Sequence, residues 1–486
     1  MADIRTEFKR IDNILHEDAG TNGAGDYMAQ MSWILFLKYL DDLEGTRKAE
    51  TVFHGEVYEP LFKDEFQWDN WAAPKLPDGK PDLTAQRTGK DLIEFVNQKL
   101  FPYLKSFKTI ENDPKSLIYK IGEIFGEITN KINSGRNLRD VIDIIDNLRF
   151  QTQDELDQLS ALYEDRLKLM GGAGRSGEYY TPRPLIQAMI QAVGPELDKT
   201  IYDGAAGSAG FLTEAYAYLR DKVSTSGELK FLKESTFFGK NKKPEPYLLG
   251  TMNMILHGVE SPNMEHGNTL NEDTRSIEEK DRHDYILANP PFGGSERPEV
   301  QRNFKVQSRE TANLFMQHFM KKLRTGGEAA IVIKNTFLTN EPTGATGNIR
   351  RELVDGYNLH TILDLPGGVF KTNTTTGVKT VVLFFRKGEP TRDIWYYQLN
   401  PGRNLGKTNP LNSSDFADFL VKYKTRETSE NSWTVNIEDV DKSTLDLGVK
   451  NPHEPEVEEL KSPEEILEDI KAIDKEVVEI LKGIQL

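Results

Sequence analysis

Short apolar runs alternate with helical stretches between Gly177 and about Gly388, and this alternation constrains the fold more than any other feature. Such a pattern predicts a mainly parallel sheet with helices on both faces. The candidate strands are residues 200–202, 236–238, 285–288, 329–333, 361–365 and 380–385. We therefore expect an α/β domain in the middle of the chain.

The first third of the chain has a different pattern. From about residue 3 to 170 the sequence is helical, and its apolar positions recur at three- and four-residue steps, as at Met28, Met31, Leu35 and Leu43. A second helical group follows, including residues 117–132 and 156–170, and ends at a glycine cluster, residues 171–174. Clustered glycines predict a domain boundary. The expected domains are therefore an all-α domain, 1–170, and a sheet domain, 171–455.

Two segments of the sheet domain do not follow the alternation. Residues 339–348 contain Gly, Pro and Thr and predict a long loop. Residues 389–455 are polar and irregular, and the pattern assigns them no elements.

The last segment, residues 456–486, is predicted to be a helix that binds a partner. Ser462 to Glu465 form a capping box with proline at the first helical position. An apolar seam follows at alternating four- and three-residue steps: Ile466, Ile470, Ile473, Val477, Ile480 and Ile484. Heptad-type spacing favours a separate subunit as the partner, although packing on the chain's own core stays open.

Composition excludes several kinds of protein. The chain has no cysteine and its eight histidines lack ligand-like spacing, so we predict neither disulfides nor a metal site. Its most apolar N-terminal stretch, residues 31–40, contains Lys38 and is too short to span a bilayer, so we expect a cytoplasmic protein without a membrane partner. A formal charge of -16 has the wrong sign for a protein that binds DNA without a partner, because neutralisation of the phosphates normally drives DNA affinity. If DNA is the substrate, a partner must supply much of the affinity.

Asn289, Pro290, Pro291 and Phe292 follow the candidate strand 285–288. An amine conjugated to a ring is a poor nucleophile because its lone pair is delocalised. The Asn289 side-chain oxygen and the Pro290 carbonyl can accept both N–H bonds of such an amine and favour its nucleophilic form. Phe292 offers a flat face for an extruded base. The tetrapeptide indicates methyl transfer to a planar amino group, or else a strand-ending turn with a core phenylalanine.

A glycine-rich turn follows the candidate strand 200–202 and precedes a helical stretch. Small residues let a backbone turn approach a ligand and present N–H groups at a helix N-terminus. An acidic residue at the strand end suits a cofactor that bears an ammonium and a carboxylate, such as S-adenosylmethionine; a purely structural turn is the alternative. The candidate cofactor residues here are Asp203, Gly204, Gly207, Ser208, Ala209 and Gly210.

A third motif immediately precedes the first helical stretch of the sheet domain. Its residues could form one wall of the same cofactor pocket, although without the other motifs they would indicate an ordinary capped helix. They are Glu178, Tyr179, Tyr180, Thr181, Pro182 and Arg183.

Taken together, these three motifs resemble the modification subunit, HsdM, of type I restriction-modification systems. The resemblance covers most of the chain and includes residues 34–40, 242–258, 267–270 and 365–370. It implies an all-α N-terminal domain, a Rossmann-like S-adenosylmethionine-dependent methyltransferase sheet and a C-terminal helical tail. The implied activity is N6-adenine DNA methylation.

The resemblance also implies roles and partners. S-adenosylmethionine would lie between residues 178–183 and the turn 203–210, with Asn268 near its adenine. Asn289 and Pro290 would hold the target amine, and Phe292 would stack on the adenine flipped out of double-stranded DNA. Two modification subunits would join one specificity subunit, which selects the DNA sequence, and a helicase-nuclease subunit would join for restriction.

Two departures from the family pattern yield predictions. Where the family often has a glutamate for the cofactor ribose, this chain has Asn241, which can bind two hydroxyls without a carboxylate's charge, so we predict weaker cofactor binding. Where Gly is commoner in the glycine turn, this chain has Ala209, for which we predict a negative φ.

The expected reaction is direct in-line transfer, with neither a covalent enzyme intermediate nor a metal. Three alternatives stay open: methylation of a protein glutamine, methylation of cytosine N4, and a non-catalytic subunit that only binds S-adenosylmethionine.

Overall fold

A computed structural model represents the chain. The structure describes residues 4–113, 116–148, 155, 159, 163, 181–259, 262–339, 343–370, 378–406, 408–453, 467, 470–473, 475 and 477. The predicted helix 156–170 and glycine boundary 171–174 fall almost entirely outside these residues, so the domain limits stay predictions.

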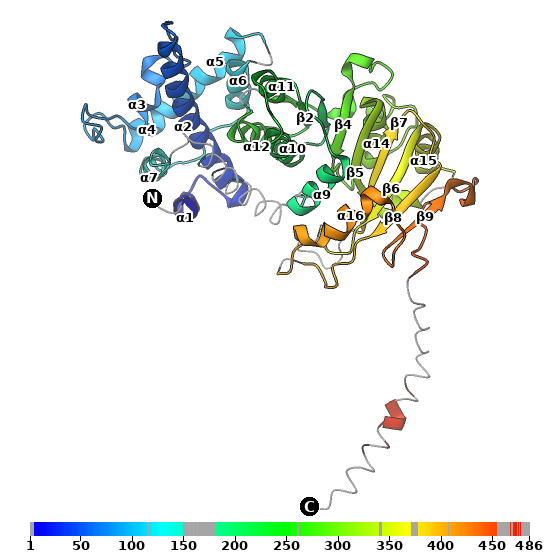
Figure 1. The fold of residues 1–486 in the computed structure, drawn as a ribbon. Helices are drawn as coiled ribbons and strands as arrows, with labels where there is room; N and C mark the ends of the chain where they lie inside the picture. The colour runs from blue at the N-terminus through cyan, green and yellow to red at the C-terminus, as the bar shows by residue number, and fades with distance from the viewer. Residues whose placement is uncertain are drawn as a thin grey trace, which may run out of the picture.

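The N-terminal domain is helical, as the sequence predicts (Figure 1). The apolar stripe of the longest helix packs into one core that includes Trp33, Trp68 and Trp71. The serines before α6 and α7, Ser116 and Ser134, each accept a backbone N–H and so cap the helix. The helices are α1 (Ile4–Glu17), α2 (Gly23–Phe53), α3 (Trp68–Trp71), α4 (Gly89–Phe95), α5 (Phe101–Ile110), α6 (Leu117–Glu127) and α7 (Gly135–Asp146).

In the described part of the second domain, nine strands form one sheet in the order β3-β2-β1-β4-β5-β7-β6-β8-β9. The pairings of β7 with β5 and β6, and of β8 with β9, are antiparallel, and the others are parallel, which confirms a mainly parallel sheet. The strands are β1 (Ile201–Asp203), β2 (Phe237–Asn241), β3 (Asn263–His266), β4 (His283–Ala288), β5 (Leu323–Lys334), β6 (Tyr357–Asp364), β7 (Thr380–Lys387), β8 (Asp393–Gln398) and β9 (Ser432–Asn436).

All six predicted strands overlap observed ones, while β3, β8 and β9 were not predicted. β3 is a four-residue edge strand with two exposed polar residues, so it lacks the apolar run by which the others were recognised. β8 and β9 lie within residues 389–455, which are therefore more regular than their composition suggests.

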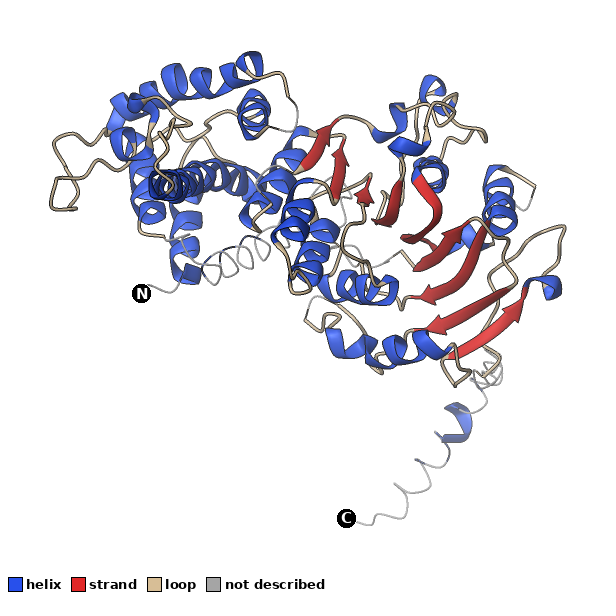
Figure 2. Cartoon of the chain, turned by 45° about the horizontal axis from the view of Figure 1, so that its top comes forward, coloured by secondary structure: helices blue, strands red, loops and turns tan. Residues whose placement is uncertain are grey.

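Helices cover both faces of this sheet (Figure 2). One face packs against α9, α10 and α16, and the other against α14 and α15, in two separate apolar clusters. The helices are α9 (Arg183–Val193), α10 (Gly210–Arg220), α11 (Ser226–Glu234), α12 (Pro244–Leu256), α13 (Pro298–Gln301), α14 (Thr311–Lys322), α15 (Ala345–Gly356) and α16 (Ala417–Thr425).

Two predicted boundaries are wrong. The loop expected over 339–348 ends early because α15 begins at Ala345, where Thr346 accepts a buried hydrogen bond of 3.0 Å from Asn313. The helical stretch expected over 117–132 ends at Glu127.

The two domains contact each other at the β3 edge of the sheet. Leu248, Leu249 and Met252 of α12 belong to the core of the helical domain. Lys120 of α6 reaches across and donates a 2.6 Å hydrogen bond to the carbonyl of Met264 in β3. The helical domain therefore supports the helix that follows β2, next to the candidate cofactor turn.

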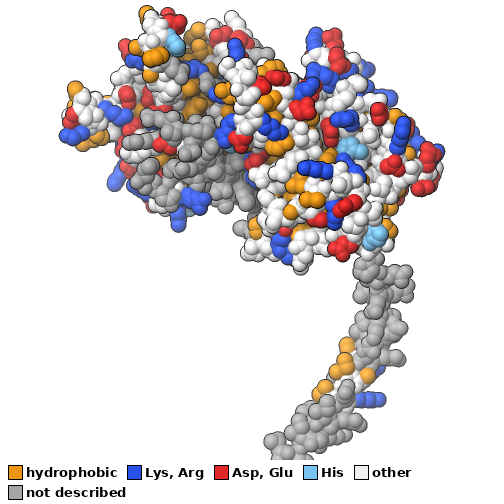
Figure 3. Space-filling view, viewed as in Figure 1, with side chains coloured by type: hydrophobic (Ala, Val, Ile, Leu, Met, Phe, Trp, Pro, Cys, Tyr) orange, Lys and Arg blue, Asp and Glu red, His pale blue; other side chains and the backbone are white. Residues whose placement is uncertain are grey.

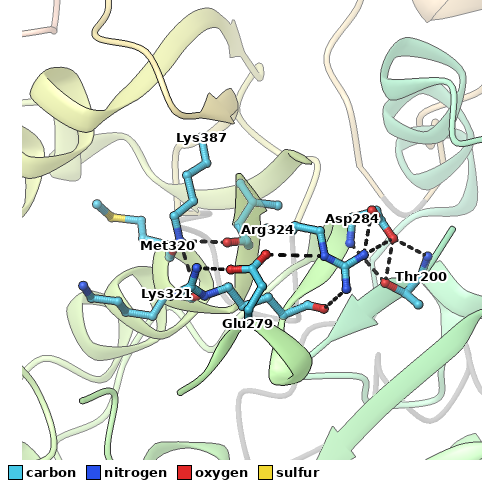
Figure 4. A network of polar contacts seen from close by, with 9 residues as sticks. Thr200, Glu279, Asp284, Met320, Lys321, Arg324 and Lys387 are labelled. Atoms are coloured by element: carbon cyan, nitrogen blue, oxygen red, sulfur yellow. Dashed lines mark hydrogen bonds and ion pairs between the residues drawn. The ribbon is translucent and has the colours of Figure 1, made fainter. Parts of the chain in front are cut away.

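A polar network fixes the amino ends of the central strands (Figure 4). Arg324 of β5 donates to both carboxylate oxygens of Asp284 in β4, at 2.9 Å each. Asp284 in turn accepts from the backbone N–H and the hydroxyl of Thr200, just before β1. These contacts set the register of β1, β4 and β5, and hence the positions of their carboxyl ends.

Part of the predicted C-terminal helix is described, and it lies apart from the sheet domain (Figure 1). Leu467, Ile470, Ile473 and Val477 are between 45% and 59% exposed, so these residues do not pack on the chain's own core. The rest of the predicted seam lies outside the described residues. Among the helices that the structure describes, none is long and apolar enough to cross a bilayer.

Candidate functional site

The glycine turn and the Asn-Pro-Pro-Phe motif meet at one edge of the sheet. β1 and β4 are parallel neighbours, with Tyr202 opposite Ile286, so their carboxyl ends lie side by side. β1 also pairs with β2 on its other side, which makes the β1–β4 boundary the point where the strand order reverses. In open α/β sheets, ligands bind at such a switch point, beyond the carboxyl ends of the strands.

Close packing shapes the glycine turn. A Cβ at Gly204 would lie 2.8 Å from the Tyr202 hydroxyl and about as close to two other side chains, and Gly207 has a positive φ of 53°. The Thr269 hydroxyl holds the Gly204 carbonyl at 2.5 Å, and Asn253 of α12 donates to the carbonyl of Ser208 at 2.8 Å. The turn leads into α10 at Gly210. Residues 253 and 269 lie in segments that resemble the family, but no sequence pattern indicated that Asn253 and Thr269 hold the glycine turn, because both act on it from distant segments.

The backbone conformation of Ala209 differs from the one predicted. Its φ is 62°, in the left-handed region, where a negative value was predicted. The residue is the N-cap of α10, and the tight turn reverses the chain there, which requires this conformation. Glycine adopts it without the steric cost that alanine carries, which explains why glycine suits this position.

Asp203 is the buried carboxylate of the site. It is 1% exposed, and its recorded partner is the backbone N–H of Ala205, at 2.9 Å. Burial raises the pKa of Asp203 to about 7, because the carboxylate loses hydration and one N–H bond offsets only part of that loss. A ligand ammonium would restore favourable interactions. The site therefore fits a cofactor that carries a cationic amine.

Asn241 lies at the end of β2, beside the turn, but its amide group already has protein partners. Its oxygen accepts from the Gly207 N–H at 2.8 Å, and its nitrogen donates to the carbonyls of Gly207 at 2.9 Å and Pro246 at 3.1 Å. In this arrangement Asn241 ties the glycine turn to the start of α12. The predicted contact with the cofactor ribose stays a prediction.

Asn289 directly follows β4, and its side chain forms a single described hydrogen bond. Its side-chain nitrogen donates to the Thr181 hydroxyl at 2.8 Å, which fixes the orientation of the amide. Its side-chain oxygen is buried and has no hydrogen-bond partner among the described residues. A buried acceptor without a donor is costly, so this oxygen is suited to an incoming N–H group. Pro290 is buried and Pro291 exposed.

Phe292 is 3% exposed and packs edge to face on Phe370, with ring centroids 5.2 Å apart. Because its ring is almost fully covered, stacking on a base requires a local rearrangement. The stacking role therefore stays a prediction.

Only part of the predicted cofactor motif, residues 178–183, is described, and that part supports the glycine turn. Arg183 donates to the Gly210 carbonyl at 2.7 Å and forms an ion pair with Glu214 at 3.4 Å. Burial lowers the pKa of Arg183 to about 10. Arg183 thus fixes the start of α10, with Pro182 as the N-cap of α9. Glu178, Tyr179 and Tyr180 lie outside the described residues.

Asn268 lies near the glycine turn, because the next residue, Thr269, donates a hydrogen bond to the Gly204 carbonyl. Its side-chain oxygen accepts from the Leu270 N–H at 3.1 Å and caps a short 3₁₀ turn. The side chain is half-buried at the same edge of the sheet, so a cofactor contact remains compatible with its position.

Comparisons with known proteins agree with this architecture. Residues 9–145 match the HsdM N-terminal domain, and residues 154–461 match the N-6 DNA Methylase family. The chain is 34% identical to the type I restriction enzyme EcoEI methylase subunit of Escherichia coli, over 98% of this chain and 96% of that protein. It is 30% identical to the StySPI methylase subunit of Salmonella potsdam, over 83% and 78%.

Solved structures show the same similarity. A modification subunit of a putative type I restriction enzyme from Vibrio vulnificus YJ016 superposes with a TM-score of 0.81 at 36% identity, covering 92% of this chain and 96% of that one. A chain from a type I restriction-modification complex superposes with a TM-score of 0.78 at 35% identity, covering 98% and 96%. The chain therefore belongs to the N6-adenine DNA methyltransferases, as a methylase subunit of the type I restriction-modification family.

Proposed function

We propose that this chain transfers a methyl group from S-adenosylmethionine to N6 of an adenine flipped out of double-stranded DNA. The observation that carries the proposal is the buried oxygen of Asn289, which has no partner in the described part of the chain, at the strand edge that also holds Asp203. The Asn289 oxygen suits an amine that must be polarised, and the Asp203 carboxylate suits a cationic methyl donor.

The protein's own groups would hold the cofactor as follows. Asp203 binds the ammonium, and the turn from Gly204 to Gly210 provides close backbone approach and N–H groups at the start of α10. The bound cofactor supplies an electrophilic methyl group on a good leaving group. Asn241 holds the turn rigid through the backbone of Gly207.

Asn289 acts on the substrate amine. Its oxygen accepts one N–H, the Pro290 carbonyl accepts the other, and the Thr181 hydroxyl fixes the amide so that it presents oxygen rather than nitrogen. These acceptors draw the lone pair out of conjugation and disperse the positive charge that develops on N6. Orientation supplies much of the rate, since the reaction is a direct displacement.

The chain would work within a complex. We propose two copies on one specificity subunit, which selects the DNA sequence, with a helicase-nuclease subunit added for restriction. The type I methylase relatives support membership of a multi-subunit complex, and the net charge of -16 indicates that a partner supplies DNA affinity. The exposed residues Leu467, Ile470, Ile473 and Val477 provide an apolar stripe for a partner helix.

The test is to express the chain with its neighbouring specificity subunit and to identify the methylated nucleoside in host DNA. N6-methyladenine in the wild type and its loss in Asn289→Ala support the proposal. Asn263→Ala, which removes another half-buried amide at the start of β3, bonded to the carbonyls of Glu234 and Phe237, is the matched control and should retain activity. N4-methylcytosine, methylated protein, or cofactor binding without turnover would each replace the proposal with one of the three alternatives.

A further inference from the structure

The segment that follows the Asn-Pro-Pro-Phe motif forms a closed excursion, residues 293–310. Its two ends pair, since Ser295 forms a β-bridge with Glu310 and the Glu296 N–H donates to the Arg309 carbonyl at 3.1 Å. The Thr311 N–H then donates to the carbonyl of Gly294 at 3.3 Å. The excursion therefore leaves and re-enters the fold directly beside the catalytic motif.

Its interior is anchored to the sheet domain. Phe304 is 4% exposed, and Asn303 donates to the Leu270 carbonyl at 3.0 Å. Gln317 of α14 binds both the N–H and the carbonyl of Val306, at 2.9 Å and 2.8 Å. Side chains on the outer surface of the excursion are therefore held at defined positions relative to Asn289.

Three exposed arginines of the excursion have no carboxylate partner among the described residues: Arg297, Arg302 and Arg309. Two other charges of the excursion pair with residues outside it, Glu296 with Lys242 at 3.1 Å and Lys305 with Glu352 at 3.0 Å, while the exposed Glu299 forms no ion pair among the described residues. Figure 3 shows Lys and Arg side chains on the upper part of the sheet domain, with Asp and Glu side chains among them. We call the three arginines the arginine rim.

The rim carries positive charge in an acidic chain. The protein has a net charge of -16, and some arginines elsewhere are neutralised by carboxylates, as Arg403 is by Asp415 and Arg324 by Asp284. A guanidinium left unpaired on a rigid surface can bind a phosphate through two parallel N–H bonds. Such contacts position DNA without reading its sequence.

We propose that Arg297, Arg302 and Arg309 bind phosphates of the target strand beside the adenine presented to Asn289. This inference rests on the proposed function. A base leaves the helix only when its backbone rotates, so holding the flanking phosphates next to the acceptor oxygen would stabilise the extruded base. The specificity subunit would then choose the site, while the rim aligns the strand at the point of chemistry.

The test uses the complex reconstituted with the specificity subunit. The variant Arg297→Gln/Arg302→Gln/Arg309→Gln is compared with Arg386→Gln/Arg392→Gln/Lys424→Gln, which removes the same charge from exposed residues at the amino edge of the sheet. DNA affinity is measured as a function of salt. Each lost phosphate contact lowers the slope of log affinity against log salt by about 0.9. We expect the salt dependence of the rim variant to be less steep than that of the wild type, by about 2–3 in slope for each modification subunit.

The rim variant should also raise the KM for DNA at least tenfold, leave the cofactor dissociation constant unchanged, and assemble normally. The control variant should match wild type in all three. A rim variant with wild-type slope and KM overturns the inference, as does one that fails to assemble with the specificity subunit, because the rim would then be a protein interface. Adenine methylation by the wild-type complex tests the proposed function separately.

Discussion

Asn241→Ala tests whether this residue organises the cofactor turn or only contacts the cofactor. Asn241 is 5% exposed and makes three hydrogen bonds, two to the backbone of Gly207 and one to Pro246. At about 1 kcal/mol net for each bond, its removal should lower the free energy of unfolding by about 3 kcal/mol. Because the loosened turn must be reordered on binding, we also expect cofactor affinity to fall at least tenfold.

The assays are denaturant unfolding of the cofactor-free protein and calorimetric titration with S-adenosylmethionine. Asn263→Ala is the control, since it removes two side-chain hydrogen bonds, from the start of β3 to the carbonyls of Glu234 and Phe237, away from the cofactor turn. It should cost about 1–2 kcal/mol of stability and leave cofactor affinity unchanged. If Asn241→Ala weakened cofactor binding but kept the wild-type stability of the cofactor-free protein, Asn241 would not hold the turn, and a direct ribose contact would explain the loss.

Three further predictions concern single residues of the site. Asn289→Ala should lower the methylation rate by at least 100-fold while the cofactor dissociation constant stays within twofold of wild type, since in the proposed mechanism the lost oxygen accepts a hydrogen bond from the amine; near-normal turnover would remove Asn289 from the mechanism. Because the pKa of Asp203 is raised to about 7, S-adenosylmethionine should bind more tightly at pH 8 than at pH 6, and Asp203→Asn should abolish that difference. By the same linkage, the folded cofactor-free protein holds this proton more tightly than the unfolded chain, so its stability should fall as the pH rises from about 4 to 7. Ala209→Gly should change stability by less than about 1 kcal/mol, because relief of the left-handed backbone offsets the lost buried methyl group; Ala209→Val should unfold at a clearly lower temperature, and equal melting of the two variants would argue against the positive φ.

The elements that could be predicted from the sequence were those marked by a continuous run of apolar residues. The strands with apolar runs, such as β4 and β7, were located within a few residues, because burial on both faces leaves a continuous apolar signature. The polar edge strand β3 gave no such signature. The start of α15 was misjudged because the Gly and Thr residues that suggest a loop are tolerated once tertiary contacts such as Asn313 to Thr346 stabilise the helix.

The sequence by itself determined the chemistry available to the protein: an acceptor amide after one strand, and an acidic residue and small residues after another, in an order typical of one family. The tertiary structure decided how these groups are used. It set the partners of Asn241, the left-handed backbone of Ala209 and the pairing of Thr181 with Asn289, residues 108 apart in the chain. The physical reason is that these features depend on which strand ends become neighbours, and local periodicity carries no information about contacts between segments so distant in sequence.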